Sequence, residues 1–129
     1  MTVGLSTTNT ADKLLNSVAG VGTTFTAGSV YVKLHTGDPG SAGTANASAV
    51  TTRVAATFTA SSAGTKSLAS MASTYAMTTT ETISHISLHD AATAGNFLWS
   101  VALTTSKSVI NGDTLSLTSL TLAFSPLAA

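Results

Sequence analysis

The sequence of 129 residues has no cysteine, only two prolines and one tryptophan, and few charged side chains. Without cysteine the chain forms no disulfide bond and no thiolate metal site, and the redox state of its compartment stays open. Charged residues make up 8% of the chain, against about 25% in an ordinary soluble domain. The apolar runs are only a few residues long, whereas a membrane-spanning helix needs ~20 apolar residues. These absences exclude a disulfide-bonded scaffold, a zinc–thiolate domain and a helical membrane protein.

The few charges also argue against several kinds of partner. Five basic and five acidic side chains give a formal net charge of zero. The basic residues are scattered, so we expect no nucleic-acid partner, which would require a basic patch. We also expect no membrane partner, because the N-terminus lacks the features of a signal peptide and no lipidation or polybasic signal is present. The basic residues are Lys13, Lys33, Arg53, Lys66 and Lys107.

About half of the residues are Ala, Thr or Ser, and the mean hydropathy is +0.37. A neutral surface with few charges promotes association between copies. Two interpretations follow: the surface is covered by neighbours in an assembly, or hydration of the many hydroxyl groups keeps a free monomer soluble. The first is favoured, and we expect a homo-oligomer, of which a trimer is one form.

The clearest structural signal is the segment 29–43. Alternation places Val30, Val32 and Leu34 on one face of a strand, which stops at a Gly-Asp-Pro-Gly turn at 37–40. Before it, helical spacing of apolar residues predicts a short helix over 10–19, capped by Asn9 or Thr10 at its start and by Gly20 at its end. A helix this short must pack on a sheet. We assign residues 1–8 to a polar N-terminal arm and residues 9–129 to a single β domain.

Later segments alternate in the same way, at 51–60, 81–90 and 96–103, and more weakly at 68–77. Asn111-Gly112-Asp113 predicts a hairpin with a type I′ turn, and 114–124 a last strand with a bulge near Ser119. The predicted fold is therefore all-β, an antiparallel β-sandwich or small barrel with one short N-terminal helix. We expect these side chains to be mostly buried: Val32, Leu34, Phe58, Ile86, Leu88, Phe97, Trp99, Val101, Leu117 and Leu122.

Histidines and acids provide two candidate sites. Glu81, His85 and His89 are spaced by four residues, and on a helix they would form a metal site. The β-branched neighbours favour a strand, which places the two histidines about 13 Å apart at ~3.3 Å per residue. We therefore expect no metal site but two half-exposed histidines. His35 and Asp38 form a possible acid–base pair, although Asp38 is expected to cap its own turn.

The other chemical motifs are weaker. No Gly-x-Ser-x-Gly elbow is present, and Gly20-Val21-Gly22 lacks the further glycines and the Lys-Ser/Thr of a phosphate-binding loop. Trp99 lies on an alternating apolar face and is expected in the core, not on a ligand-binding surface. The prediction is a protein without catalytic residues, cofactor sites or metal sites, and not an enzyme.

Several segments, taken in order, resemble a known family. They are a front helix, then Val-Tyr-Val-Lys-Leu-His-Thr-Gly-Asp-Pro-Gly (30–40) with Gly-Thr-Ala-Asn (43–46), then Thr-Arg-Val-Ala-Ala-Thr-Phe (52–58), Thr-Glu-Thr-Ile-Ser-His-Ile-Ser-Leu-His-Asp-Ala-Ala (80–92), Gly-Asn-Phe-Leu (95–98) and Asn-Gly-Asp-Thr-Leu (111–115). The chain is similar over nearly its whole length to small virion proteins of tailed double-stranded DNA phages, common among phages of actinobacteria. Members are labelled tail-fibre-like, minor tail or minor capsid proteins.

The resemblance implies a structural protein of the virion, assembled in the host cytoplasm, and carries over no catalytic residue. A compact domain without a long repeat shaft favours a capsid decoration or minor capsid protein on the outside of the head, bound to the major capsid protein. The alternative is a tail-surface, tail-tip or tail-fibre-like component, bound to tail proteins. A more distant alternative is a carbohydrate-binding module, which would require Trp99, Tyr31 and Tyr75 to be exposed.

Overall fold

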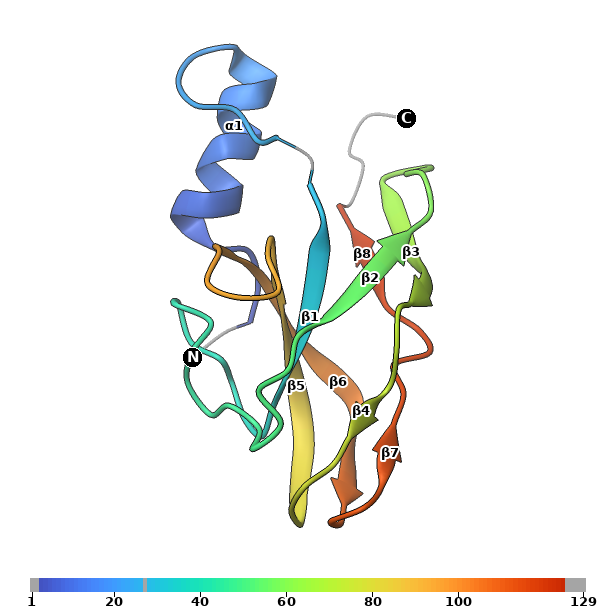
Figure 1. Ribbon diagram of the computed structural model, residues 1–129. Helices are drawn as coiled ribbons and strands as arrows, with labels where there is room; N and C mark the ends of the chain where they lie inside the picture. Colours follow the sequence, from blue (N-terminus) through green and yellow to red (C-terminus); the bar gives the residue numbers. More distant parts are fainter. Residues whose placement is uncertain (1–2, 27, 125–129) are drawn as a thin grey trace.

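The computed structural model describes residues 3–26 and 28–124 (Figure 1). A π-helical turn, one α-helix and eight strands follow one another along the described chain. They are η1 (Thr7–Ala11), α1 (Asp12–Ala19), β1 (Val30–His35), β2 (Val54–Phe58), β3 (Thr65–Met71), β4 (Tyr75–Ala76), β5 (Glu81–His89), β6 (Phe97–Val109), β7 (Thr114–Leu115) and β8 (Thr121–Ala123).

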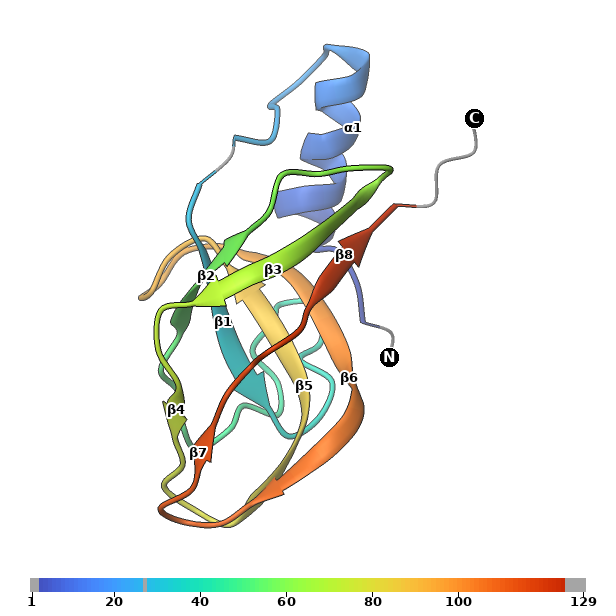
Figure 2. The ribbon, with the colours of Figure 1, turned by 90° about the vertical axis from the view of Figure 1, so that its right-hand side faces the viewer.

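Six strands form one antiparallel sheet in the order β6-β5-β1-β2-β3-β8, and β4 pairs with β7 in a small second ladder. The large sheet curls strongly, so that β3 and β8 cross in front of β5 and β6 (Figure 2). The result is a half-barrel with a single α-helix at its N-terminal end. The prediction of an antiparallel all-β fold of sandwich or small-barrel type with one short helix is confirmed.

The inner face of the half-barrel holds the core. Val32 and Leu34 of β1 lie opposite Leu88 and Ile86 of β5, and all four are buried. Phe97, also expected in the core, is buried as well. The other five expected core residues are only partly buried against it, namely Phe58, Trp99, Val101, Leu117 and Leu122. The core also contains residues that alternation did not single out: Val50, Ile83, Val109 and Leu120.

A bulge in β6 places Phe97 and Trp99 on opposite faces of the sheet. Regular alternation would put Phe97 and Trp99 on one face, but the register shifts between Leu88 and His89. Leu88 pairs with Trp99, whereas His89 pairs with Phe97. Directly opposed residues share a face, so Phe97 lies on the outer face of the sheet and Trp99 on the inner one. The prediction that both belong to one apolar face is wrong, because an extra residue in a strand reverses every side chain after it.

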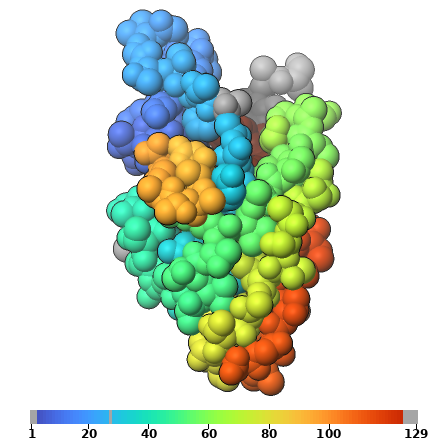
Figure 3. All heavy atoms as spheres, viewed as in Figure 1, coloured from blue at the N-terminus to red at the C-terminus, as the bar shows by residue number. Residues whose placement is uncertain are grey.

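The α-helix begins later than predicted and packs differently. Thr7–Ala11 forms a π-turn, and the cap is Ser6, whose Oγ accepts a hydrogen bond from the amide of Asn9 (3.3 Å). Gly20 ends α1 in the left-handed conformation, as predicted. No residue of α1 itself is buried, and α1 forms a lobe beyond the sheet (Figure 3). The expectation that the helix packs on the sheet is therefore wrong.

The described part of the predicted arm, residues 3–8, lies along the edge strand β6. The amide of Ser6 donates to Leu98 O (2.8 Å), and the amide of Ser100 donates to Gly4 O (2.8 Å). The arm thus covers the upper part of this edge with its own backbone. Removing it would therefore weaken folding as well as any particle contact. The division into an arm (1–8) and a β domain (9–129) stays a prediction.

The predictions for the hairpin at 111–113 and for the strand over 114–124 are both wrong about which strands pair. After β6, the chain turns at 110–113, where only Gly112 has a positive φ, of 94°. A type I′ turn needs positive φ at two residues, and β7 pairs with β4 instead of β6. The single strand expected over 114–124 is two short strands, since β8 pairs with β3. The change of apolar face near Ser119 marks this change of partner.

A loop over 36–49 folds back over the outer face of β1. Asp38 Oδ1 accepts from the amide of Gly40 (2.8 Å), which confirms that Asp38 caps its own turn. The amide of Ala45 donates to Pro39 O (2.9 Å), and the amide of Ser48 donates to Leu34 O (3.1 Å). Pro39 is fully buried. The turn after β1 is thus packed against its own sheet and is not an exposed tip.

Gly43 in this loop provides a test of the packing. A Cβ built at Gly43 (φ +69°) would lie 2.4 Å from a ring carbon of the buried Phe97, whereas at Gly112 (φ +94°) it meets nothing within 4 Å. We predict that Gly112→Ala costs about 1–2 kcal/mol, from backbone strain alone. Gly43→Ala should cost a further ~1–3 kcal/mol from overpacking. Urea denaturation of both variants measures the difference, and equal losses would show that the loop does not press on Phe97.

Candidate binding surfaces

The predicted metal candidates all lie on β5 but have separate partners. Glu81 binds the hydroxyl of Ser48 and accepts from the amide of Ala49 (3.2 Å). His85 is partly buried, and its Nδ1 hydrogen-bonds to Ser84 Oγ (2.8 Å). His89 is buried, not half-exposed as expected. In the described part of the chain, no group of three or more His, Cys, Asp or Glu side chains is placed to hold a metal ion.

His35, Ser87 and His89 form a buried chain of hydrogen bonds on the outer face of the sheet. His35 Nδ1 lies 2.8 Å from Ala45 O, and His35 Nε2 lies 2.7 Å from Ser87 Oγ. Ser87 Oγ in turn lies 2.9 Å from His89 Nε2. Asp38 takes no part in this chain. The sequence did not predict it, because alternation assigns these residues to a face without showing that a loop covers that face.

The direction of every hydrogen bond in this chain follows from its first partner. A carbonyl only accepts, so Ala45 O requires a proton on His35 Nδ1. With His35 neutral, its Nε2 accepts from the Ser87 hydroxyl, and the Ser87 oxygen then accepts from His89 Nε2–H. His89 Nδ1 is left without a proton, and it is buried with no hydrogen-bond partner among the described residues.

Burial keeps both histidines neutral. Desolvation is the main cause that lowers the pKa of His35, and also that of His89, which falls to about 4. The positive charges of Arg53 and Lys33 lower the pKa of His89 further. Ser87 has no exposed surface, so no substrate reaches its hydroxyl. The arrangement therefore holds the core in place and offers no nucleophile to solvent.

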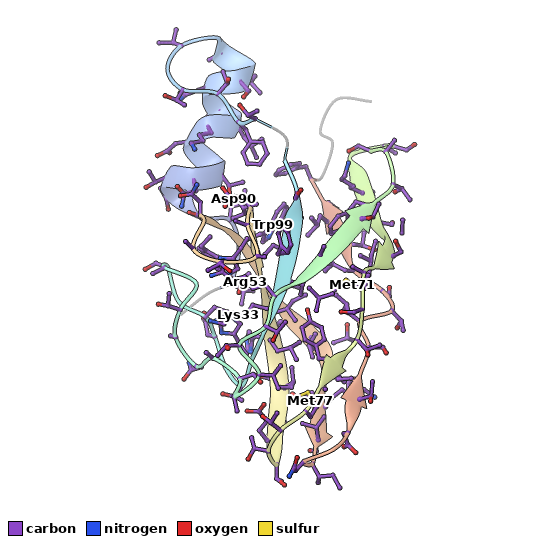
Figure 4. All side chains as sticks on the ribbon, viewed as in Figure 1. Lys33, Arg53, Met71, Met77, Asp90 and Trp99 are labelled. Carbon is purple, nitrogen blue, oxygen red and sulfur yellow. The ribbon has the colours of Figure 1, made fainter. Side chains whose placement is uncertain are left out.

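A cavity of about 620 Å³ lies between α1, the connection to β1 and the inner face of the sheet. Trp99 and Phe124 form part of its wall, with their ring centroids 5.9 Å apart. Asn9, Lys13 and Lys66 also line it. Aromatic and polar side chains thus share the wall of this cavity, and Trp99 lies below α1 (Figure 4). The expectation that Trp99 is a core residue is therefore only half met.

The aromatic platform required by the carbohydrate-binding alternative is not assembled. Tyr75 is 2% exposed, and its hydroxyl donates to Val32 O at 2.6 Å. Burial raises the pKa of Tyr75. Tyr31 and Trp99 are partly exposed, but Tyr31 is absent from the wall of the Trp99 cavity. The three rings therefore do not form one exposed surface.

Lys33 and Arg53, two of the five basic side chains, lie near each other beside the turn between β5 and β6 (Figure 4). Arg53 donates to the carbonyls of Ala91 (3.0 Å) and Ala94, so its charge fixes that turn. Burial and the nearby Arg53 lower the pKa of Lys33. Asp90 on the same turn accepts from the amide of Asn96 (2.6 Å). These groups stabilise a turn and make no extended basic patch.

Gly20-Val21-Gly22 lies after the C-terminal end of α1, whereas a phosphate-binding loop precedes a helix. None of the described helices is long and apolar enough to cross a membrane.

The buried histidines predict a loss of stability in acid. The folded pKa of His89, about 4, lies below its ordinary value of 6.5. Its contribution is therefore fully present above pH 6.5 and is lost as pH falls from 6.5 to 4. We expect the free energy of unfolding to drop by about 3 kcal/mol over this range. In His89→Gln the drop should be much smaller, whereas His85→Gln should retain it. Urea denaturation from pH 7 to 4 measures both, and identical profiles for the two variants would contradict the assignment.

Trp99 and Phe97 differ in burial, so we expect truncation of each to Ala to lower the free energy of unfolding by a different amount. Truncating the buried Phe97 to Ala should destabilise by about 3–5 kcal/mol. Trp99→Ala should cost about half as much, because its ring already borders the cavity. Trp99 is the only tryptophan, so its fluorescence should be quenched by acrylamide in the native state. A spectrum protected from acrylamide, together with a cost equal to that of Phe97→Ala, would place Trp99 in a closed core.

Two comparisons with known proteins were informative for this chain. A search of curated proteins finds no match. A family model described as podophage GP4 fiber I protein gp80 matches residues 4–125, which covers nearly all of the chain, from the N-terminal arm to the residue after Phe124. The match agrees with the phage virion family that the ordered motifs resemble. The chain belongs to this family of phage fibre-type structural proteins, and is a component of the virion.

Proposed function

We propose that the chain is a non-enzymatic structural subunit of the phage tail, a fibre-type component that associates with copies of itself and with other tail proteins. The observation that carries the proposal is the family match along residues 4–125, whose description names a fibre protein. The low charge of the chain supports a role in a crowded assembly, because few like charges oppose contact between copies.

Two features of the described chain support a structural role. The serine that two histidines contact is sealed inside the protein, which argues against hydrolytic chemistry at that point. The exposed apolar side chains of α1, Leu15 and Val18, have no cover in the isolated chain. Exposed apolar clusters of this kind mark protein contacts. A subunit held among neighbours would bury them.

The sequence alone favoured decoration of the head, and the same composition argument applies there. The family's description instead favours the tail, and no feature of the described residues points to the head lattice. The proposal is therefore for the tail, with head decoration as an outcome that the experiment detects. The carbohydrate-binding alternative loses support, since Tyr75 is in the core.

Copy number and position on purified particles test the proposal together. Isotope-labelled peptides from this chain and from the major capsid protein give the number of copies per virion, and gold-labelled antibody locates them by electron microscopy. We expect a few to a few tens of copies, with gold at the tail. Hundreds of copies with gold on the head would replace the tail role by head decoration. Absence from particles would overturn the virion role itself.

A further inference from the structure

The half-barrel is open along one side, where a slot separates β6 from the chain that follows β7. We call it the barrel slot. Leu103–Lys107 of β6 forms one wall and Leu115–Ser119 the other, around a cavity of about 350 Å³. Core side chains form its floor, namely Leu34, Tyr75, Ile83 and Ile86. Figure 2 shows the two backbone segments whose residues line the slot, namely the lower part of β6 and the segment that joins β7 to β8.

Both walls of the barrel slot have backbone groups without a strand partner. β6 is an edge strand, and the described part of the N-terminal arm bonds to it at Leu98 and Ser100. Below that, Ile83 pairs with Lys107 and His85 with Ala102, so one residue of β5 faces four of β6. Among the described residues, 116–119 pair with no strand. An apolar floor between two open edges is a surface that an apolar, uncharged partner surface can cover.

The opposite end of the molecule carries a second uncovered surface, which we call the helix lobe. It consists of Leu15, Val18 and Val21, which are 68%, 88% and 76% exposed. The chain continues from Val21 to Thr26 without regular secondary structure or any charged residue. This segment is held against α1, because Asn16 Nδ2 donates to Thr23 O (3.0 Å) and the amide of Phe25 donates to Ser17 Oγ (3.1 Å). The helix lobe therefore presents an exposed apolar cluster, with an uncharged segment beside it.

The two surfaces lie at opposite ends of the described chain, with α1 at one end and the β6–β7 turn at the other (Figures 1 and 3). A second copy placed end to end covers both surfaces with one kind of contact. Charge does not oppose this contact, because Lys107 is the only charged residue in the walls of the slot and the helix lobe has none. These observations favour a second copy of this chain over an unrelated partner.

We propose that the helix lobe of one copy docks in the barrel slot of the next, with its apolar side chains over the apolar floor of the slot. The contact is heterologous, since it joins two different surfaces. Such contacts continue into open rows unless the rotation closes them into a ring. This inference rests on the proposed self-association and identifies its surfaces.

Two surface variants test the docking, one at each end. The lobe variant is Val18→Lys with Val21→Lys, and the slot variant is Thr105→Arg with Thr118→Arg. All four positions are exposed, so both variants should fold, which circular dichroism and thermal melting check. The blocked ends carry the same charge and cannot attract each other. Thr57→Arg and Thr93→Lys, at exposed positions outside both surfaces, are the matched controls.

Sedimentation velocity and light scattering of the purified full chain give the result. The wild type and both controls should form species larger than a dimer as concentration rises, whereas each blocked variant alone should stay monomeric. An equimolar mixture of the two variants should form a 1:1 dimer and nothing larger, because one intact lobe meets one intact slot. A wild type that is monomeric throughout, or a mixture that stays monomeric, would overturn the docking. These outcomes are independent of copy number and position on the particle, which test the tail role.

Discussion

Burial of the outer face at the centre of the sheet is the constraint from which much of the structure follows. The loop after β1 covers this face, and an unpaired polar group there would cost about 1–3 kcal/mol. His35 and Ser87 avoid that cost by bonding to each other and to Ala45 O. Phe97 fills the space beside His89, their ring centroids 5.8 Å apart. The bulge that puts Phe97 there turns Trp99 inward, where it lines the cavity below α1.

The sequence predicted those parts of the fold in which each residue's environment follows from its neighbours. Strict alternation in β1 and β5 identified Val32, Leu34, Ile86 and Leu88 as core, and the Asp38 turn was recognised from local chemistry. Prediction failed where a distant segment decides the outcome. Periodicity cannot show an extra residue in β6. The Asn111-Gly112 turn signal says that the chain reverses, not which strand it will pair with.

The sequence predicts self-association but does not locate the surfaces that we propose for it. Low charge indicated that the surface is covered by neighbours, yet nothing in the composition located the contact. Helical spacing showed that α1 has an apolar stripe, and the usual partner of such a stripe is the protein's own sheet. Here Leu15 and Val18 face away from the body. Only the three-dimensional arrangement shows that this stripe and the open side of the barrel lie at opposite ends, so that one copy can complete another.

The pairing of the N-terminal arm with β6 has a consequence for biosynthesis. Gly4 donates its amide hydrogen to the hydroxyl of Ser100, a partner 96 residues later in the chain. During translation the arm therefore has no edge to join until β6 has left the ribosome. The first described residues are thus among the last to reach their folded positions. Until then, β5 lacks its neighbour and exposes a hydrophobic strand. Rapid synthesis, or a chaperone that shields β5, should therefore raise the yield of folded protein in the infected cell.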